Sequence, residues 1–197
     1  MQTRPVGRRF LARDPLEVAP ELLGLVLEQR ADGQRLRARI VEVEAYRGAE
    51  DPGSHAYRGL TPRTKTLFGP AGHLYVYFTY GMHWCMNVVC GVSGTAAGVL
   101  LRAAEPVVGL DVMRTRRPKA ARDRDLLRGP ARLTQAFGID GSDDGRDLCT
   151  RDATLRLLDD GAPRPVVARS VRIGLGPGRG EALPFRFTVA GSRFVSG

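Results

Sequence analysis

One stretch decides how this chain folds: residues 35–46, which read RLRARIVEVEAY. Apolar residues recur at every second position, which is the pattern of a β-strand. The pattern changes phase midway, because the face that carries arginine as far as Arg39 carries valine and alanine from Val41 onward. A bulge, or a strand that passes from one environment into another, explains such a change. In either case Glu44 and Tyr46 point to the same side.

Further β-strands are expected on both sides of this stretch. Residues 25–28 form a hairpin with it through the turn Ala31-Asp32-Gly33. A second hairpin is expected from residues 74–79 and 83–90, with Tyr80-Gly81-Met82 at its tip. The remaining strand candidates are residues 99–103, 155–158, 166–173 and 185–189.

Helices are expected to be few and short. Asp14-Pro15 has the form of an N-cap followed by a first-turn proline, and opens a helix that continues to Leu22. Glu105-Pro106 introduces a second helix, around residues 110 to 113. Gly129-Pro130 opens a third, which continues to Phe137.

The arginine-rich residues 114–128 allow two interpretations. They form either a flexible charged connection or the continuation of the helix before them. The other patterns predict a mixed α+β fold, in which residues 1–197 make a single compact domain around a curved, largely antiparallel β-sheet with short flanking helices.

The composition narrows the location and the partners. No apolar run approaches the roughly 20 residues that span a bilayer, and no secretory signal is recognisable after Met1. The three cysteines form no C-x-x-C pair, so a reduced environment is expected. The expected location is cytoplasmic and nucleoid-associated, with no membrane contact. A net charge of +9 and an isoelectric point near 10.3 predict attraction to polyanions, of which nucleic acid is the commonest.

Two glutamates are candidates for catalysis. Hydrolysis of an N-glycosidic bond needs a carboxylate beside the sugar, which deprotonates water and stabilises the positive charge that develops there. Glu42 and Glu44 both qualify by type. Glu44 also shares a face with Tyr46 and is followed by a long loop over residues 48–70, an arrangement that can place it at the mouth of a pocket.

An enzyme that acts on a base within duplex DNA needs flat side chains in two places. It must enclose the extruded base, and it must fill the space that the base leaves. Tyr46, His55 and Tyr77 are candidates for the first task, and Tyr80 with Met82 for the second. The alternative for each is a structural role in a strand or loop. An apolar hairpin tip that faces solvent, however, needs a partner.

A series of short motifs follows in one order along nearly the whole chain, and together they are far more specific than any single one. They are Val41–Tyr46, Thr61–Arg63, Leu74–Tyr77, Tyr80–Met82, Cys85–Asn87, Leu100–Ala103, Glu105-Pro106, Gly129-Pro130, Arg146–Leu148, Arg172–Gly174 and Arg186-Phe187. This set resembles the alkyladenine (3-methyladenine) DNA glycosylase family, in its monofunctional type without a helix-hairpin-helix motif.

The resemblance implies a base-excision-repair enzyme that flips damaged purines and leaves an abasic site. Glu44 corresponds to the glutamate that activates the attacking water, and Arg102 to the arginine that helps to hold both. The implied substrates are 3-methyladenine and 7-methylguanine, with hypoxanthine and ethenoadenine as further candidates. Neutral lesions are poorer leaving groups, and no second carboxylate is clearly placed to protonate them.

The resemblance also assigns the residues that hold the base. Tyr46, His55 and Tyr77 correspond to the pocket that encloses it, and Asn87 to the asparagine that excludes the 2-amino group of normal guanine. Tyr80 corresponds to the intercalating tyrosine, next to Met82 at the same tip.

The expected partner is double-stranded DNA that contains a damaged purine, bound by a monomer. Arg63 and Lys65, with some of the arginines in residues 114–128, are candidates for phosphate contacts. The chemistry requires no cofactor, and no metal-ligand spacing is visible. Strand cleavage would need an amine nucleophile, and neither Lys65 nor Lys119, the only lysines, has a matching catalytic motif. A glycosylase without lyase activity is therefore expected.

Two other function classes stay open on the residues alone. A non-catalytic nucleic-acid-binding module could use the same basic surface and strand aromatics, and would not need Glu44. A carbohydrate glycosidase could use Glu42 or Glu44 as its acid or base, although the net charge fits DNA better.

Overall fold

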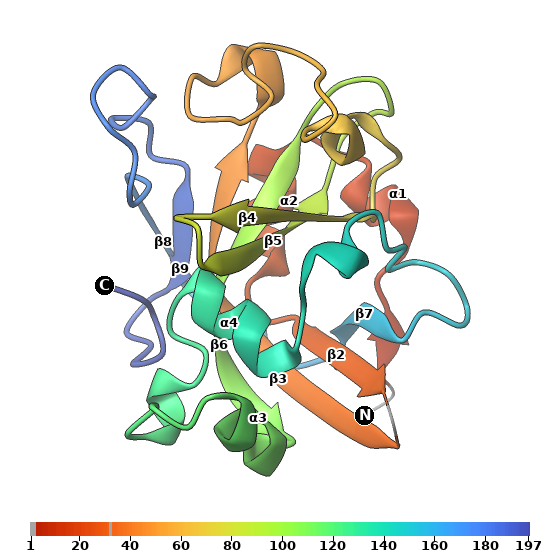
Figure 1. Cartoon of the computed structure of the whole chain (residues 1–197), viewed down its shortest axis with the longest axis vertical. Helices are drawn as coiled ribbons and strands as arrows, with labels where there is room; N and C mark the ends of the chain where they lie inside the picture. Colours follow the sequence, from red (N-terminus) through yellow and green to blue (C-terminus); the bar gives the residue numbers. More distant parts are fainter. Residues whose placement is uncertain (1–2, 32) are drawn as a thin grey trace.

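The computed structural model describes residues 3–31 and 33–197, so Asp32 of the expected first turn lies outside it. The described residues form one curled, antiparallel sheet in the order β1-β7-β2-β3-β6-β5-β4, with β8 and β9 attached to β3 (Figure 1). The strands are β1 (Arg4–Pro5), β2 (Val26–Ala31), β3 (Gln34–Tyr46), β4 (Leu74–Thr79), β5 (His83–Val89), β6 (Gly98–Val108), β7 (Leu155–Asp159), β8 (Val167–Ser170) and β9 (Arg186–Val189).

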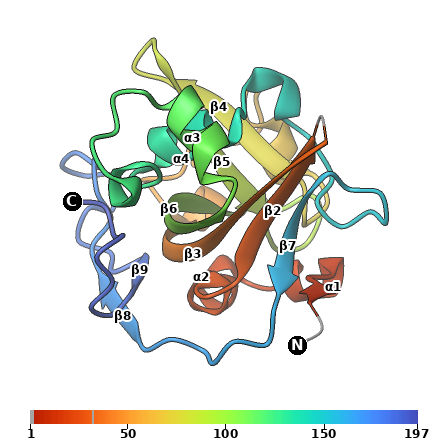
Figure 2. The ribbon, with the colours of Figure 1, turned by 90° about the horizontal axis from the view of Figure 1, so that it is seen from below.

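Short helices flank this sheet, as expected for a mixed α+β domain. In Figure 2, α1 and α2 lie below the strands and α3 and α4 above them, and the connection from β7 to β8 passes beneath α2. The α-helices are α1 (Arg8–Leu11), α2 (Pro15–Leu22), α3 (Leu110–Arg116) and α4 (Pro130–Phe137), and the 3₁₀ turns are η1 (Gly48–Glu50), η2 (Lys65–Phe68), η3 (Asp123–Asp125) and η4 (Gly141–Asp143). Within the described part of the chain, no helix has the length and apolar composition needed to cross a membrane.

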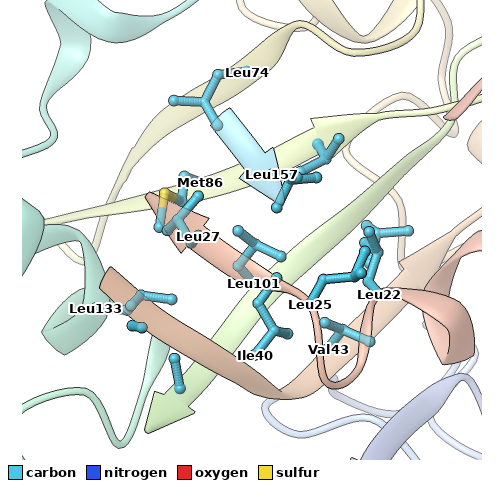
Figure 3. Close-up of a cluster of buried hydrophobic side chains, with 14 of the residues drawn as sticks. Leu22, Leu25, Leu27, Ile40, Val43, Leu74, Met86, Leu101, Leu133 and Leu157 are labelled. Atoms are coloured by element: carbon cyan, nitrogen blue, oxygen red, sulfur yellow. The ribbon is translucent and has the colours of Figure 1, made fainter. Parts of the chain in front are cut away.

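The central strand β3 contains the bulge that its sequence predicts. Ile40 pairs with Ala104 and Glu42 with Ala103, so Val41 has no partner on β6. The extra residue reverses which side of the sheet each later side chain faces. Ile40 and Val43 therefore both enter the main core (Figure 3), although they stand three positions apart.

The bulge determines where the site lies. Leu36, Ala38 and Ile40 pack in the core before it, and Val43 and Ala45 after it. Glu42, Glu44 and Tyr46 consequently face away from the core, toward the opposite side of the curled sheet. The prediction that Glu44 and Tyr46 share a side is confirmed, since the Tyr46 hydroxyl donates to Glu44 Oε2 over 2.9 Å.

The prediction that Glu105-Pro106 introduces a helix is wrong. Both residues belong to β6, which continues to Val108, and α3 begins only after Gly109. Proline is tolerated because β5 pairs only with the beginning of β6, so no strand lies on that edge at Pro106 to need its missing N–H. The reversal is made by Gly109, with φ of +83°, where a Cβ would lie 2.8 Å from the Arg35 carbonyl oxygen.

Of residues 114–128, only the first three continue the helix. The helix continues as far as Arg116, and the chain then folds back through η3. Arg114 holds this return, because its Nη2 lies 2.8 Å from Asp123 Oδ2.

Candidate active site

A cavity of about 350 Å³ opens on the side of the sheet that faces away from the core. This volume is near the lower end of the range for small-ligand sites. Its walls come from β3, β4, β5 and β6, from the loop after β3, and from residues 173–179. Among the residues that line it are Tyr46, His55, Tyr77, Tyr80, Asn87 and Arg102, all of which the sequence selects as site residues.

Glu44 lies behind this wall and is fully buried. Its Oε2 accepts from the Tyr46 hydroxyl and lies 3.3 Å from Arg102 Nη1, and its Oε1 accepts from the Ile173 backbone N–H over 2.8 Å. All three partners line the cavity. Burial, followed by the nearby Glu44 carboxylate, raises the pKa of Tyr46, so this hydroxyl remains a donor to the carboxylate.

Arg102 reaches Glu44 from a second bulge, on the neighbouring strand. Val43 pairs with Leu101 and Glu42 with Ala103, which leaves Arg102 without a partner on β3. Bulges of this kind redirect a side chain beside active sites. The guanidinium joins both glutamates, because Nε donates to Glu42 Oε1 over 2.9 Å while Nη1 contacts Glu44.

Three aromatic rings form the outer wall of the cavity. Tyr75 and Tyr77, two apart on β4, are stacked with centroids 5.5 Å apart, and His55 meets Tyr77 edge-on at 4.5 Å. Burial raises the pKa of the Tyr77 hydroxyl. The Arg63 guanidinium lies 5.7 Å from the centre of the Tyr77 ring.

His55 is electrically neutral at physiological pH. Partial burial, and then the charge of Arg63, lower the pKa of its imidazole to about 4. Solvent screens part of this effect, since the outer surface of His55 is exposed. Its Nδ1 lies 3.1 Å from the Tyr75 hydroxyl, which fixes the ring at the rim of the cavity.

Asn87 forms part of the floor. The residue is buried on β5, and its amide nitrogen donates to the Tyr75 carbonyl oxygen over 3.4 Å. That bond restricts rotation of the amide, so the side chain presents a constant outline to a ligand.

The tip of the β4–β5 hairpin lies at the cavity, which Tyr80 helps to line. Tyr80 is 81% exposed and Met82 is 68% exposed. Tyr80 is also the one residue other than glycine with positive φ in the described structure, at +52°. A left-handed backbone is unfavourable for tyrosine, so this conformation presents an apolar side chain to solvent at a conformational cost.

The basic candidates separate into two groups. Neither Arg63 nor Lys65 lines the cavity, but Arg63 lies against the ring of Tyr77, which does, whereas Lys65 is exposed on η2. In the arginine-rich segment, Arg114 and Arg122 are paired with nearby aspartates. Arg117 differs, because its Nε and Nη1 are buried without a hydrogen-bond partner among the described residues.

Arg117 borders a second, basic cavity of about 470 Å³. Arg128, Arg132 and His83 also line it, and Pro130 borders both cavities. Burial, and then the charge of Arg132, lower the pKa of the Arg117 guanidinium. An anion in this cavity would relieve both effects.

The sequence reasoning missed three site features: Tyr75, the Ile173 amide and Arg172. Tyr75 could have been found by parity, because it stands two positions before Tyr77 on one strand. Arg172 is fully buried against Asp51 and lies 4.5 Å from the centre of the Tyr46 ring. No local pattern reveals a pairing between residues 121 positions apart.

Among the described residues, no group of three or more His, Cys, Asp or Glu side chains is arranged to hold a metal ion.

Comparison with known proteins identifies the family of this chain. Residues 9–193 match the family model of methylpurine-DNA glycosylase. A protein of Burkholderia lata is 56% identical over 96% of this chain and 90% of its own length. Proteins of Streptomyces avermitilis and Carboxydothermus hydrogenoformans are 47% and 44% identical, over 98% and 96% of this chain and 91% and 97% of their own. All three are named 3-methyladenine DNA glycosylase as a provisional assignment. The chain belongs to the methylpurine-DNA glycosylase family.

Proposed function

We propose that this protein is a DNA glycosylase that removes 3-methyladenine and 7-methylguanine from duplex DNA and leaves an abasic site. One observation carries the proposal: a fully buried carboxylate, Glu44, stands directly behind an aromatic cavity with Arg102 against it. The family membership and the names of the relatives agree with this substrate class.

In the proposed reaction, Glu44 takes a proton from water while the water oxygen attacks the sugar carbon C1′. The bond from C1′ to the base nitrogen breaks, and its electron pair leaves with the base. Oε1 of Glu44 receives one hydrogen bond, from Ile173, so one of its lone pairs remains for the water. The same negative charge stabilises the positive charge that develops on the sugar.

The cavity suits a flat base that has left the helix. Tyr46, His55 and Tyr77 enclose it, and Tyr80 with Met82 enters the space left in the duplex. An alkylated purine is cationic, and its attraction to an electron-rich ring contributes about 0.5 to 2 kcal/mol. Asn87 excludes the 2-amino group of undamaged guanine.

Hypoxanthine and ethenoadenine are slower substrates in this proposal. These neutral bases need a proton on leaving, and His55 does not supply it, because its pKa of about 4 keeps it deprotonated at neutral pH.

Arginines near the base cavity and at the basic cavity hold the DNA backbone in this proposal. Arg63 lies against Tyr77 of the base cavity, and Arg117 with Arg132 lines the basic cavity that shares Pro130 with it. A phosphate fits the second cavity, since it provides acceptors for the unpaired nitrogens of Arg117. Lys65 adds a weaker, more distant contact.

The proposal is tested by single-turnover release of 7-methylguanine from duplex DNA. The wild-type protein releases free base, and Glu44→Gln binds the same duplex but reacts about 10² to 10⁴ times more slowly. Glu21→Gln, which changes an exposed glutamate of α2, serves as the control and keeps full activity. If the wild-type protein releases no base from methylated, etheno or hypoxanthine duplexes, the enzyme proposal fails and a nucleic-acid-binding module is the better account.

A lyase step is absent from the proposed reaction. It would require an amine beside C1′, and no lysine lines the base cavity among the described residues. Borohydride reduction during turnover should therefore trap no covalent complex with DNA. A trapped complex would contradict the water-based mechanism.

A further inference from the structure

We infer that Glu42 is a positioning residue for the reaction. It holds Arg102 in place against Glu44, and its negative charge offsets part of the positive charge of Arg102 that acts on Glu44. The inference rests on the proposed function for its kinetic readout only, because the charge relation between the two glutamates also exists in the free protein.

Glu42 is fully buried and accepts from four hydrogen-bond donors. Its Oε1 accepts from Arg102 Nε over 2.9 Å, from Arg186 Nε over 2.8 Å and from the Ser196 hydroxyl over 2.9 Å. Its Oε2 accepts from the Ser196 backbone N–H over 2.6 Å. Of these partners only Arg102 lines the base cavity, whereas all three partners of Glu44 line it, so Glu44 is the carboxylate on the side of the base.

Arg102 is shared between the two carboxylates. Its Nε is directed at Glu42 and its Nη1 at Glu44, while the guanidinium lines the base cavity. Because the guanidinium is planar, fixing Nε fixes the direction of Nη1. Glu42 therefore determines how Arg102 meets Glu44 and the water between them.

Arg186 and Ser196 lock Glu42 from the other side. Arg186 lies on β9, opposite Glu44 in the strand register, and its Nη2 donates to the Ser196 carbonyl oxygen over 2.9 Å. These bonds leave Glu42 no freedom to turn toward Glu44.

The charged and titratable groups around Glu44 come from five strands and one loop. They are Glu42 and Tyr46 on β3, Arg102 on β6, Arg186 on β9, Tyr77 on β4, Cys85 on β5 and Arg172 in the loop between β8 and β9. Removal of the Glu42 charge leaves the positive charge of Arg102 to act on Glu44 alone, which favours the ionised form of Glu44. Removal of the Arg186 charge has the opposite effect.

The chain contains a matched control. Glu28 is equally buried and also accepts from three arginines, Arg30, Arg35 and Arg37, at 2.6 to 2.8 Å. It lies on β2, and none of these residues lines the base cavity. Glu28→Gln therefore removes an equally buried carboxylate charge, with arginine partners that are more exposed than those of Glu42, without touching Arg102.

The test is the pH dependence of single-turnover 7-methylguanine release by Glu42→Gln and Glu28→Gln, together with the affinity for the same duplex. Glu42→Gln should react about 10²-fold more slowly at neutral pH, because the guanidinium of Arg102 stays beside Glu44 but is no longer held in one orientation. The acid limb of its profile should move to lower pH by about one unit or more. Glu28→Gln should keep the wild-type rate and midpoint, and both variants should bind DNA normally.

Arg186→Gln provides a second variant, with the acid limb expected to move to higher pH. The same two shifts should appear when the ¹³C-labelled Glu44 carboxyl is titrated by NMR without DNA, which tests the charge relation even if no substrate is cleaved. The inference is overturned if neither variant moves the Glu44 midpoint, or if both move it in one direction. Loss of base release by the wild-type protein, with the NMR shifts intact, would refute the proposed function instead.

Discussion

The buried ion pair between Arg172 and Asp51 should be among the most sensitive points of the molecule. Both side chains are fully buried, and they meet through two contacts of 2.5 and 2.6 Å. The other donors to Asp51 are the backbone N–H groups of Arg47 and Gly53, at 3.2 and 3.0 Å. Arg172→Met would leave the Asp51 carboxylate buried with these two bonds only.

The expected loss follows from that uncompensated charge. Breaking a buried pair by removing one partner costs about 3 to 5 kcal/mol in the free energy of unfolding. For a chain of this size, such a loss lowers the melting temperature by about 6 to 20 °C. Arg39→Met breaks the half-exposed pair with Asp160 and should cost no more than about 1 kcal/mol, so it is the control.

Urea and thermal unfolding of four proteins would measure the effect: wild type, Arg172→Met, Asp51→Asn and the double variant. The double variant should lose less stability than the two single variants together, because the neutral amide introduced at position 51 leaves no buried charge without a partner. The reasoning is refuted if Arg172→Met costs less than about 1 kcal/mol, or if the two losses are additive. Base release should also fall in Arg172→Met, since Arg172 packs on Tyr46 and precedes the Ile173 amide that binds Glu44.

Three further outcomes are expected. Tyr80→Gly should change the free energy of unfolding by no more than about 1 kcal/mol, because relief of its left-handed backbone offsets the added freedom of the unfolded chain. Base release from duplex DNA should nevertheless fall sharply. Activity equal to that of the wild type would show that Tyr80 does not fill the space left by the base. His55, with a pKa lowered from 6.5 to about 4, binds its proton more weakly in the folded state, so stability should decline as the pH falls from about 6.5 toward 4, and His55→Gln should flatten that part of the profile. Arg117→Ala should weaken duplex binding and reduce the slope of log affinity against log salt by about one phosphate contact. Arg122 is already paired with Asp125, so Arg122→Ala should change this slope little. Equal effects of the two substitutions would refute phosphate binding in the cavity beside Arg117.

Much of the fold could be predicted from local patterns. The strand at residues 34–46, its bulge and the two hairpins all follow from alternation and turn residues, which act over short distances. The same patterns misplaced one boundary. Glu105-Pro106 has the form of a helix start, but pairing with β3 keeps it in a strand, and no local signal reports which edge of a strand is free.

The chemistry of the site could be predicted only in part from such patterns. Glu44 and Tyr46 share a face by parity, whereas the approach of Arg102, Ile173 and Arg186 to the glutamates depends on bulges and strand pairings between distant segments. Residue type likewise could not separate the two glutamates. Glu42 and Glu44 stand two apart on one strand, yet Glu42 is bonded to Arg186 and Ser196 outside the base cavity, whereas every partner of Glu44 lines it.

The sequence by itself therefore determined the strand, its change of face and the residue types available for glycosidic chemistry, because the period of a strand and the preferences of turns are local properties. Tertiary structure alone decided which carboxylate lies against the base cavity and which arginines are already paired. It also decided which ones, Arg117 among them, keep buried nitrogens without a partner among the described residues. The physical reason is that hydrogen bonds and ion pairs in this site join residues up to 154 positions apart, and the local pattern of residues carries no information about such contacts.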